Sequence, residues 1–245
     1  MSSSVTYEVD EGVARITLDD GGPNTLKTDV FNAFFAHLDA AESDAAVGAV
    51  VIAGREGFFS AGMDLKWMQT ISREQLGTIG PDLARLTHRI FIFPKPVIAE
   101  VNGHAIAGGA VLLLACDRSV GAHGAYKTGL NEVAIGIPLG GFGMELATSR
   151  LAPGAMSGGM LYGEVFEPQR AHELGYLDEL VEPERLRERV TEIATAAAAL
   201  SSFAYVATKH AMRGKLAEEI REQAESGVLV PLFQAFADFR AKTDA

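Results

Sequence analysis

Three segments of the chain combine residue types that could do chemistry. Residues 58–65 and 101–110 are glycine-containing stretches that each follow an apolar run and open a helical pattern. Glycine lets the backbone approach a ligand closely, and free N–H groups at a helix start favour negative charge. Two such N–H groups directed at one oxygen would form an oxyanion hole. Residues 126–138 place a carboxylate, Glu132, in an otherwise apolar setting, where desolvation would increase its basicity.

Each of these features has a structural interpretation as well. Paired glycines before a helix are more often a plain turn, and a lone glutamate is more often a surface or ion-paired carboxylate. Ser60 has no base partner visible in the sequence, and His104 fits a hydrogen-bonded structural histidine better than a ligand. The six histidines show no metal-ligand spacing, and there is no P-loop, dinucleotide fingerprint or nucleophile elbow, so we predict no metal site.

The elements that must position these segments alternate between strand and helix. Residues 5–18 read as two short strands around a turn at 10–12, and residues 28–41 have apolar residues at helical spacing. Residues 47–53 and 97–101 are nearly all apolar, which is typical of strands buried on both faces. A helix-like stretch, 109–115, follows the second of these strands. This alternation predicts an α/β fold.

The strand pattern stops near residue 182. Beyond it the chain is predicted to be helical, with an alanine-rich run at 194–200, and no Gly/Ser linker separates it from the rest. We therefore predict a core over residues 1–182 and a C-terminal helical region over 183–245 that packs on the core or on a neighbouring subunit. Its apolar residues exceed what a solvated tail should carry and predict an oligomerisation element; they are Val228, Leu229, Val230, Leu232, Phe233, Phe236 and Phe239.

Composition sets limits on partners and on location. The chain has 245 residues, 48% hydrophobic and 22% charged, as in an ordinary globular protein. Its net charge of -11 argues against a general nucleic-acid binder, although a few local cations could still receive an anionic ligand. The single Cys116 excludes an internal disulfide. The longest apolar run, 106–116, is far short of the ~20 residues of a membrane helix, and no secretion signal is evident. We expect a cytoplasmic protein with no membrane partner.

Taken together and in this order, the three segments resemble the enoyl-CoA hydratase/isomerase (crotonase) superfamily. Residues 59–65 (FSAGMDL) are similar to its first oxyanion-hole motif, and residues 102–109 (NGHAIAGG) with 116–117 to its second. Residues 95–99 and 174–178 are also similar to family stretches. The resemblance implies a crotonase-like spiral of ββα units, homotrimers or homohexamers, and an acyl-CoA thioester as substrate. Coenzyme A is then part of the substrate, and no separate cofactor is expected.

The resemblance also implies roles for particular residues. The backbone N–H groups of Met63 and Gly108 would be the two oxyanion-hole donors. Lys66 matches a position that often contacts coenzyme A, although a solvated lysine is an equally good interpretation. The residues predicted to line the substrate site are Ala61, Gly62, Asp64, Leu65, Lys66, Gly109, Val111 and Leu139.

The catalytic positions distinguish reactions within the family. Its hydratases use two glutamates to hold and activate water, and the first of those positions is Val111 here, whereas the second is Glu132. This pattern resembles the single-glutamate isomerases that convert 3-enoyl-CoA to 2-enoyl-CoA. An acid that some relatives place after the proline is missing, because Leu139 and two glycines stand there, and Glu145 falls inside the next predicted helix. We expect an isomerase with Glu132 as its acid/base. The alternatives are a hydratase, in which Glu132 alone manages the water, and a catalytically silent acyl-CoA binding protein.

Overall fold

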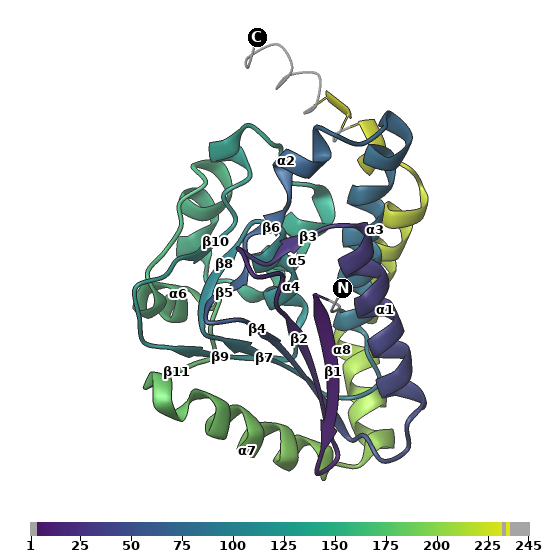
Figure 1. Cartoon of the computed structure of the whole chain (residues 1–245), viewed down its shortest axis with the longest axis vertical. Helices are drawn as coiled ribbons and strands as arrows, with labels where there is room; N and C mark the ends of the chain where they lie inside the picture. The colour runs from purple at the N-terminus through teal and green to yellow at the C-terminus, as the bar shows by residue number, and fades with distance from the viewer. Residues whose placement is uncertain (1–3, 232–233, 236–245) are drawn as a thin grey trace.

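A six-stranded sheet forms the base of the molecule in the computed structural model, which describes residues 4–231 and 234–235 (Figure 1). Its strand order is β1-β2-β4-β7-β9-β11. Only the β1–β2 pair is antiparallel; the other pairs are parallel. The strands are β1 (Val5–Asp10), β2 (Val13–Leu18), β4 (Ala49–Gly54), β7 (Val97–Val101), β9 (Arg118–Ala122) and β11 (Glu179–Val181). Every residue of β4 and β7 is buried, as expected for parallel strands covered on both faces.

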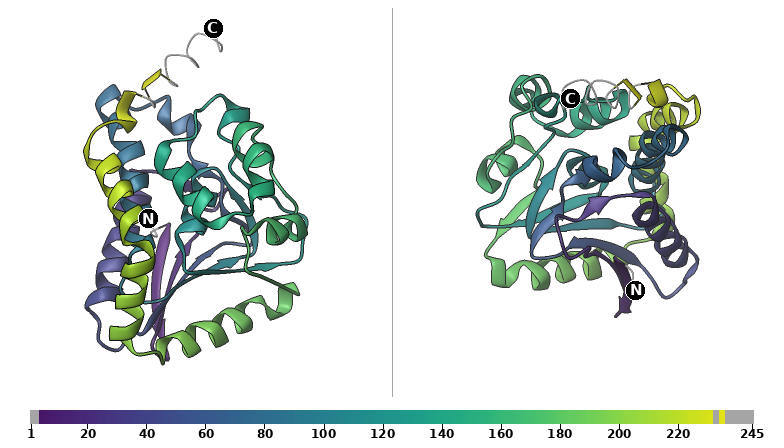
Figure 2. Two further views of the ribbon diagram at one scale, coloured as in Figure 1. Left: turned by 180° about the vertical axis from the view of Figure 1, so that it is seen from behind. Right: turned by 45° about the horizontal axis from the view of Figure 1, so that its top comes forward.

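Shorter strands build smaller sheets above this base. The first small sheet has the order β10-β8-β5 and contains β5 (Gly57–Ser60), β8 (Gly103–Ile106) and β10 (Thr128–Gly129). The second pairs β3 (Thr25–Leu26) with β6 (Gly62–Met63). The chain therefore enters the large sheet with β4, β7 and β9 in turn, and each time passes next into the small sheet with β5, β8 and β10. This repeated passage, with helices between the turns, is the spiral of ββα units that the family resemblance implied (Figure 2).

Helices surround the sheets and end the chain. They are α1 (Thr28–Ser43), α2 (Leu65–Met68), α3 (Arg73–Phe91), α4 (Gly108–Ala115), α5 (Gly141–Arg150), α6 (Pro168–Leu174), α7 (Leu186–Ala198) and α8 (Ser202–Glu225), with short helical turns η1 (Val133–Ile135), η2 (Pro153–Ala155), η3 (Met156–Leu161) and η4 (Pro183–Arg185). The predicted helix and strand limits agree with these bounds to within about two residues. No single helix in the described ranges has the length and apolarity of a membrane span; α7 with η4 and α8 meet that test only as a joined pair, bent by 101°.

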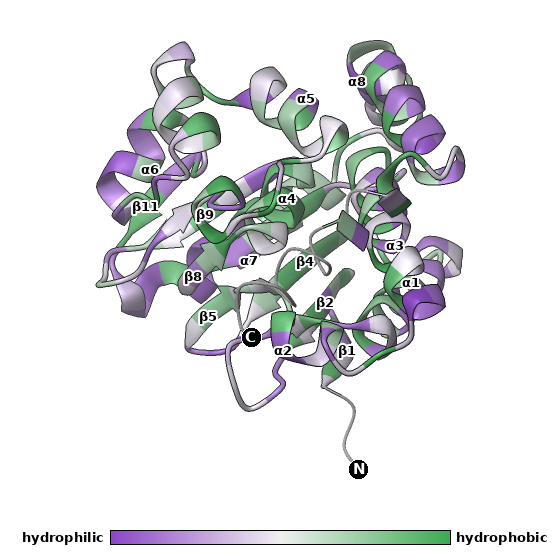
Figure 3. Cartoon of the chain, turned by 90° about the horizontal axis from the view of Figure 1, so that it is seen from above, coloured by the Kyte–Doolittle hydropathy of each residue, from purple (hydrophilic) through white to green (hydrophobic). Residues whose placement is uncertain are grey.

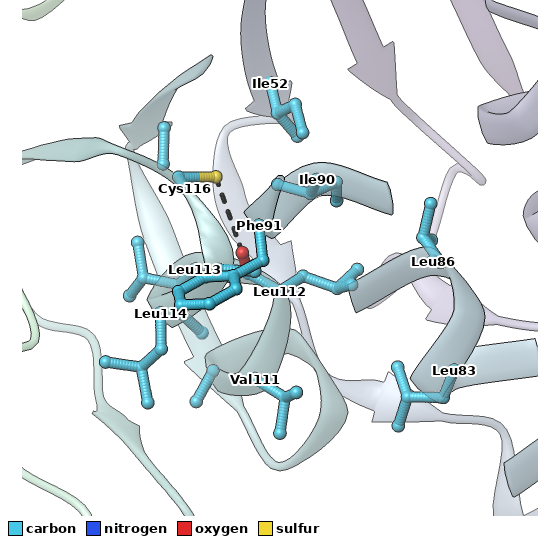
Figure 4. Close-up of a cluster of buried hydrophobic side chains, with 14 of the residues drawn as sticks. Ile52, Leu83, Leu86, Ile90, Phe91, Val111, Leu112, Leu113, Leu114 and Cys116 are labelled. Carbon is cyan, nitrogen blue, oxygen red and sulfur yellow. Dashed lines mark hydrogen bonds between the residues drawn. The ribbon is translucent and has the colours of Figure 1, made fainter. Parts of the chain in front are cut away.

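The main core surrounds α4. All eight residues of this helix are buried. Leu83, Leu86 and Ile90 of α3 lie near it in Figure 4, and the thiol of Cys116 donates to the carbonyl of Leu112 at 3.4 Å. Seen from above, hydrophobic residues concentrate on α4 and the strands, while α1 and α8 carry many hydrophilic ones (Figure 3). The helix whose N-terminus carries the second glycine motif is thus fixed on all sides by packing.

The C-terminal helices pack on the chain's own core. Helix α7 covers the outer face of the large sheet, where Leu186, Val190 and Ala194 join a second buried cluster. Helix α8 lies along α3 and α5. Of the apolar residues that predicted an oligomerisation element, Leu229 is buried and Val228 is exposed, whereas the set Leu232, Phe233, Phe236 and Phe239 falls outside the described residues.

Candidate active site

The first glycine motif directs one backbone N–H away from its own sheet. Leu26 of β3 is the register partner of Met63 in β6, and the Leu26 carbonyl accepts from the N–H of Asp64 at 3.4 Å. Because successive N–H groups of a strand point to opposite sides, the N–H of Met63 is directed away from β3. Ser60 stabilises this turn: its hydroxyl donates to the Asn24 carbonyl (2.8 Å) and accepts from the Gly62 N–H (3.1 Å). Ser60 is therefore structural, as its lack of a base partner indicated.

The second glycine motif ends at the N-terminus of α4, where the first N–H groups make no hydrogen bond within the helix. The N–H of Val111 donates to the Ala107 carbonyl at 3.0 Å, so the N–H groups of Gly108 and Gly109 precede the first bond of α4. Ala107 has φ +50°, an uncommon conformation for a residue with a Cβ atom. Strain of this kind clusters at functional sites. Here it orients the first turn of a buried helix whose dipole favours negative charge.

The two motifs are in direct contact. A Cβ atom on Gly62, which has φ +79°, would lie 2.8 Å from the Gly108 nitrogen. A Cβ atom on Gly109 would lie 2.2 Å from the Ser60 carbonyl oxygen. Only glycine fits at these two positions. The close approach brings the β6 backbone, with its outward-directed Met63 N–H, against the N-terminus of α4, which is the juxtaposition that an oxyanion hole needs.

Glu132 lies on a loop tied to the same helix N-terminus. Strand β10, just before this loop, pairs with β8, and the Ala107 N–H donates to the Gly129 carbonyl at 3.0 Å. The Glu132 side chain is 8% exposed, and its Oε2 atom has no hydrogen-bond partner among the described residues. Burial raises the pKa of Glu132 to about 7, against the opposing effect of its own backbone N–H. A buried carboxylate with a pKa near neutrality is suited to accept and return a proton.

Glu100 is also a buried carboxylate, but unlike Glu132 it forms an ion pair. Its side chain is similarly buried, but Oε2 accepts from Nη1 of Arg15 at 2.7 Å. This ion pair accounts for an acidic residue on a buried strand. No cation within the described part of the chain forms an ion pair with Glu132.

Apolar side chains occupy the position at which a second acid was weighed. Val111 is buried in the first turn of α4, and a Cβ on Gly143 would contact both its Cγ2 atom (3.7 Å) and the Leu139 side chain (3.2 Å). Glu145 lies within α5, as predicted, and its carboxylate accepts from the Gln223 amide at 3.0 Å. Leu139 is half-buried. No acid occupies the position of Val111.

The remaining predicted substrate residues lie on and beside α2. Asp64 caps this helix, with Oδ1 accepting from the Trp67 N–H at 2.9 Å, and its other oxygen pairs with Lys27 at 3.0 Å. Lys66 is exposed, whereas Ala61 and Leu65 are half-buried. Their contacts with substrate stay predictions. No group of three or more potential metal ligands occurs within the described ranges.

The sequence predicted a structural role for His104 and no particular role for Tyr176. His104 accepts from the Lys127 N–H at 3.1 Å, and its ring lies 5.2 Å from the Phe58 ring at a tilt of 34°, which is the structural role expected for it. Tyr176 lies within residues 174–178, one of the stretches that are similar to the family. It is fully buried, and burial raises the pKa of its hydroxyl. Its neighbours in sequence are apolar, so only its type, not its pattern, distinguishes it from a core residue.

Comparison with known proteins shows the family to which this chain belongs. The enoyl-CoA hydratase/isomerase family matches residues 8–239. A putative enoyl-CoA hydratase of Thermus thermophilus is 34% identical over 192 residues, covering 76% of this chain and 75% of that protein. The crystal structure of an enoyl-CoA hydratase from Mycobacterium ulcerans has a TM-score of 0.86 at 36% identity and covers 92% of this chain and 99% of its own.

An isomerase is similar to the same degree. The apo structure of an enoyl-CoA isomerase from Mycobacterium tuberculosis has a TM-score of 0.87 at 34% identity, covering 93% of this chain and 99% of its own. The chain belongs to the enoyl-CoA hydratase/isomerase family and has the crotonase fold. Its relatives carry the names of both reactions, so the family is shown, whereas the reaction must be argued from the site.

Proposed function

We propose that the protein is an isomerase that shifts the double bond of a 3-enoyl-CoA to give a 2-enoyl-CoA. The observation that carries this proposal is that one acidic residue, and not two, stands at the positions where the family's hydratases have two glutamates. Glu132 is buried on a loop tied to the α4 N-terminus, its Oε2 atom has no hydrogen-bond partner among the described residues, and the position where a second acid would stand holds Val111. Moving a proton needs one carboxylate, whereas holding and activating a water molecule is helped by two.

The proposed reaction is a proton transfer through an enolate. Ionised Glu132 removes the α-proton of the 3-enoyl thioester, and the C–H electron pair moves toward the thioester oxygen. The N–H groups of Met63 and Gly108 stabilise the negative charge that develops there. One such donor can be worth about 3 kcal/mol of barrier, so two supply several powers of ten in rate. The protonated Glu132 then returns the proton to the γ-carbon, and no atom is gained or lost.

The substrate class and assembly follow from the same proposal. An acyl-CoA thioester supplies its own activating group, so the mechanism uses no separate cofactor or metal. Ala61, Gly62, Asp64, Leu65, Lys66, Gly109, Val111 and Leu139 are proposed to line its site. We also propose a homotrimer or homohexamer.

A hydratase is the second candidate, favoured by the names of relatives such as the Thermus thermophilus and Mycobacterium ulcerans proteins. In that case Glu132 alone would activate the water that adds to a 2-enoyl-CoA. A silent acyl-CoA binding protein is the third. Assays with a 3-enoyl-CoA and with a 2-enoyl-CoA separate them: isomerisation supports the proposal, rapid water addition supports the hydratase, and tight binding without turnover supports the binding protein.

The decisive variant is Glu132→Gln, which keeps the shape of the side chain but removes the base. We expect isomerase turnover to fall by at least about 100-fold, the scale of a positioned general base, while acyl-CoA affinity measured by calorimetry stays nearly unchanged. Glu145→Gln is the matched control, because that carboxylate is bonded to Gln223, and it should keep native turnover. Normal turnover of Glu132→Gln would show that the base lies elsewhere.

A further inference from the structure

The amide that is proposed as the first oxyanion-hole donor joins Gly62 to Met63, and its own strand holds it weakly. Strand β6 has two register pairs with β3, Thr25 with Gly62 and Leu26 with Met63. Gly62 has φ +79°, and glycine is the residue with the most backbone freedom. A misplacement of about 1 Å in a catalytic group can cost about 100-fold in rate. The position of this N–H therefore depends on what holds the residues before and after it.

The residue before the amide is held by Ser60 and Asn24. The Gly62 N–H donates to the Ser60 hydroxyl at 3.1 Å, and this hydroxyl donates to the Asn24 carbonyl at 2.8 Å. Asn24 is 0% exposed, and its Nδ2 atom donates to the carbonyls of Leu18 (2.7 Å) and Phe58 (2.9 Å). These bonds fix the N-terminal side of the amide to β2 and β5.

The residue after the amide is Asp64, and groups of the chain itself occupy both of its carboxylate oxygens. Oδ1 accepts from the Trp67 N–H at 2.9 Å. Oδ2 pairs with Nζ of Lys27 at 3.0 Å and accepts from the Thr25 hydroxyl at 3.4 Å. Burial by itself would raise the pKa of Asp64, but the Trp67 N–H, Lys27 and the Lys66 N–H together outweigh burial and lower this pKa. The carboxylate is therefore ionised at neutral pH.

Lys27 is a well-fixed partner for this carboxylate. It stands directly before α1, and its carbonyl accepts from the Phe31 N–H at 2.9 Å. Helix α1 has 16 residues and packs into the main core through Phe31, Phe34 and other buried side chains. The Asp64–Lys27 pair therefore connects the turn between β6 and α2 to the start of a long helix that the core holds in place.

We propose that Asp64 is a positioning residue for the oxyanion hole: paired with Lys27, its carboxylate fixes the backbone on the C-terminal side of the Met63 N–H and keeps that N–H directed at the thioester oxygen. For its kinetic consequence this inference rests on the proposed function. Asp64 acts here through the backbone and not by contact with the reacting atoms. Ion pairs that are partly exposed to water add little stability, so loss of this pair should affect the donor more than the fold.

The test is Asp64→Asn, which separates the two interactions of the carboxylate. The asparagine oxygen can still accept from the Trp67 N–H, whereas the neutral amide forms no ion pair with Lys27. We expect kcat for 3-enoyl-CoA isomerisation to fall about tenfold, a part of the ~100- to 1000-fold that loss of a whole donor costs. KM should change by less than about twofold, because the lost interaction acts in the transition state.

A second readout does not depend on turnover. Hexanoyl-CoA labelled with ¹³C at its thioester carbonyl has no double bond to move, and its carbonyl stretching frequency falls as the oxygen accepts stronger hydrogen bonds. Infrared difference spectra should show this frequency below its value in water when the compound is bound to the native protein, and closer to that value in Asp64→Asn. An unchanged frequency would overturn the inference. A raised KM with unchanged kcat would also overturn it, and would assign Asp64 to coenzyme A binding.

Asp178→Asn is the matched control. Asp178 also accepts from a backbone N–H, that of Ser119 at 2.7 Å, and also pairs with a cation, Arg150 at 3.0 Å, but it lies where β11 joins β9. This variant should keep the native kcat and the native carbonyl frequency. An equal loss of kcat in Asp64→Asn and Asp178→Asn would indicate a general structural effect and would overturn the inference.

Lys27→Met removes the same ion pair from the other side. It should lower kcat as Asp64→Asn does, and the double variant should lower kcat no further, because the two side chains act as one unit. Additive losses would contradict the inference. If Asp64→Asn does not fold, the kcat and the infrared spectrum of Lys27→Met decide the question. If the native protein has no isomerase activity, the proposed function fails, but the carbonyl frequency of bound hexanoyl-CoA still decides whether the Asp64–Lys27 pair positions the donor.

Discussion

The burial of Glu132 suits its proposed role as acid and base and disfavours the ionised form of its carboxylate. Its pKa in the folded protein is about 7, above the ordinary value of 4.5, because burial disfavours the ionised form. Below about pH 4 the group is protonated in both the folded and the unfolded chain, and stability is unaffected. As pH rises through the interval between the two pKa values, the unfolded chain ionises first and folding loses stability, by up to about 3 kcal/mol above pH 7.

Glu132→Gln should therefore stabilise the protein at alkaline pH. The amide carries no charge, so the free energy of unfolding of the variant should exceed that of the native protein by about 1 to 3 kcal/mol at pH 8, and the difference should shrink toward pH 4. Urea unfolding of both proteins at several pH values measures this. A difference that is constant with pH, or that grows toward acid, would contradict the raised pKa.

At this scale the sequence reveals residue types better than environments. Glu132 stands out because a carboxylate interrupts an apolar segment, and Glu145 can be assigned to a helix interior by its spacing. The environment of Glu132 cannot be read from the sequence. Its carboxylate is buried only after β10, which leads into its loop, has paired with β8, and that burial raises its pKa.

At the scale of elements, α8 is fastened to the C-terminal ends of α3 and α4. Lys209 donates to the Phe93 carbonyl and to Asp117, both at 2.9 Å. Arg213 donates to the Phe91 carbonyl at 3.0 Å and pairs with Asp117 at 2.8 Å. Cations near helix C-termini interact favourably with the helix dipole. This cluster fixes α3 and α4 from their C-terminal ends, opposite the end that carries Gly108.

Lys209→Met should lower the free energy of unfolding by about 2 to 4 kcal/mol, because it leaves a buried carbonyl and the half-buried Asp117 carboxylate without their shared partner. Lys215→Met, on the same helix, is the control. Its side chain is 93% exposed and lies 3.9 Å from Glu219, so the effect should stay below about 0.5 kcal/mol. Thermal or urea unfolding compares the two; equal effects would show that the Asp117 cluster adds no stability.

The elements themselves were predictable to very different degrees. Strongly periodic helices such as α1, and all-apolar strands such as β7, are visible in the sequence because packing selects their pattern. The two-residue strands β3, β6 and β10 are not, since they exist only through pairing with other turns of the spiral. The Asp117 cluster joins residues 92 positions apart, and residues 116–117 were noticed only as part of a family-like motif.

At the scale of the whole molecule, apolar side chains are exposed to solvent beside the loop that holds Glu132. Leu161 is 69% and Tyr162 is 74% exposed, and Val133 is 44% exposed. These two segments are neighbours, since a Cβ on Gly163 would lie 2.7 Å from the Ala134 Cβ. Contiguous apolar surface of this kind marks interaction sites in soluble proteins. Together with the proposed trimer or hexamer, it predicts that a second copy of the chain covers this patch.

Light scattering at micromolar concentration should therefore give three or six times the chain mass of 26.0 kDa. Leu161→Glu should shift the mass toward the monomer, because a charge buried in an interface without a partner is strongly unfavourable. Phe203→Glu is the matched control: Phe203 is 84% exposed on α8, away from the Glu132 loop, and its substitution should leave the assembly intact. A monomeric native protein would refute the assembly. Dissociation by Phe203→Glu but not by Leu161→Glu would place the interface on α8 instead.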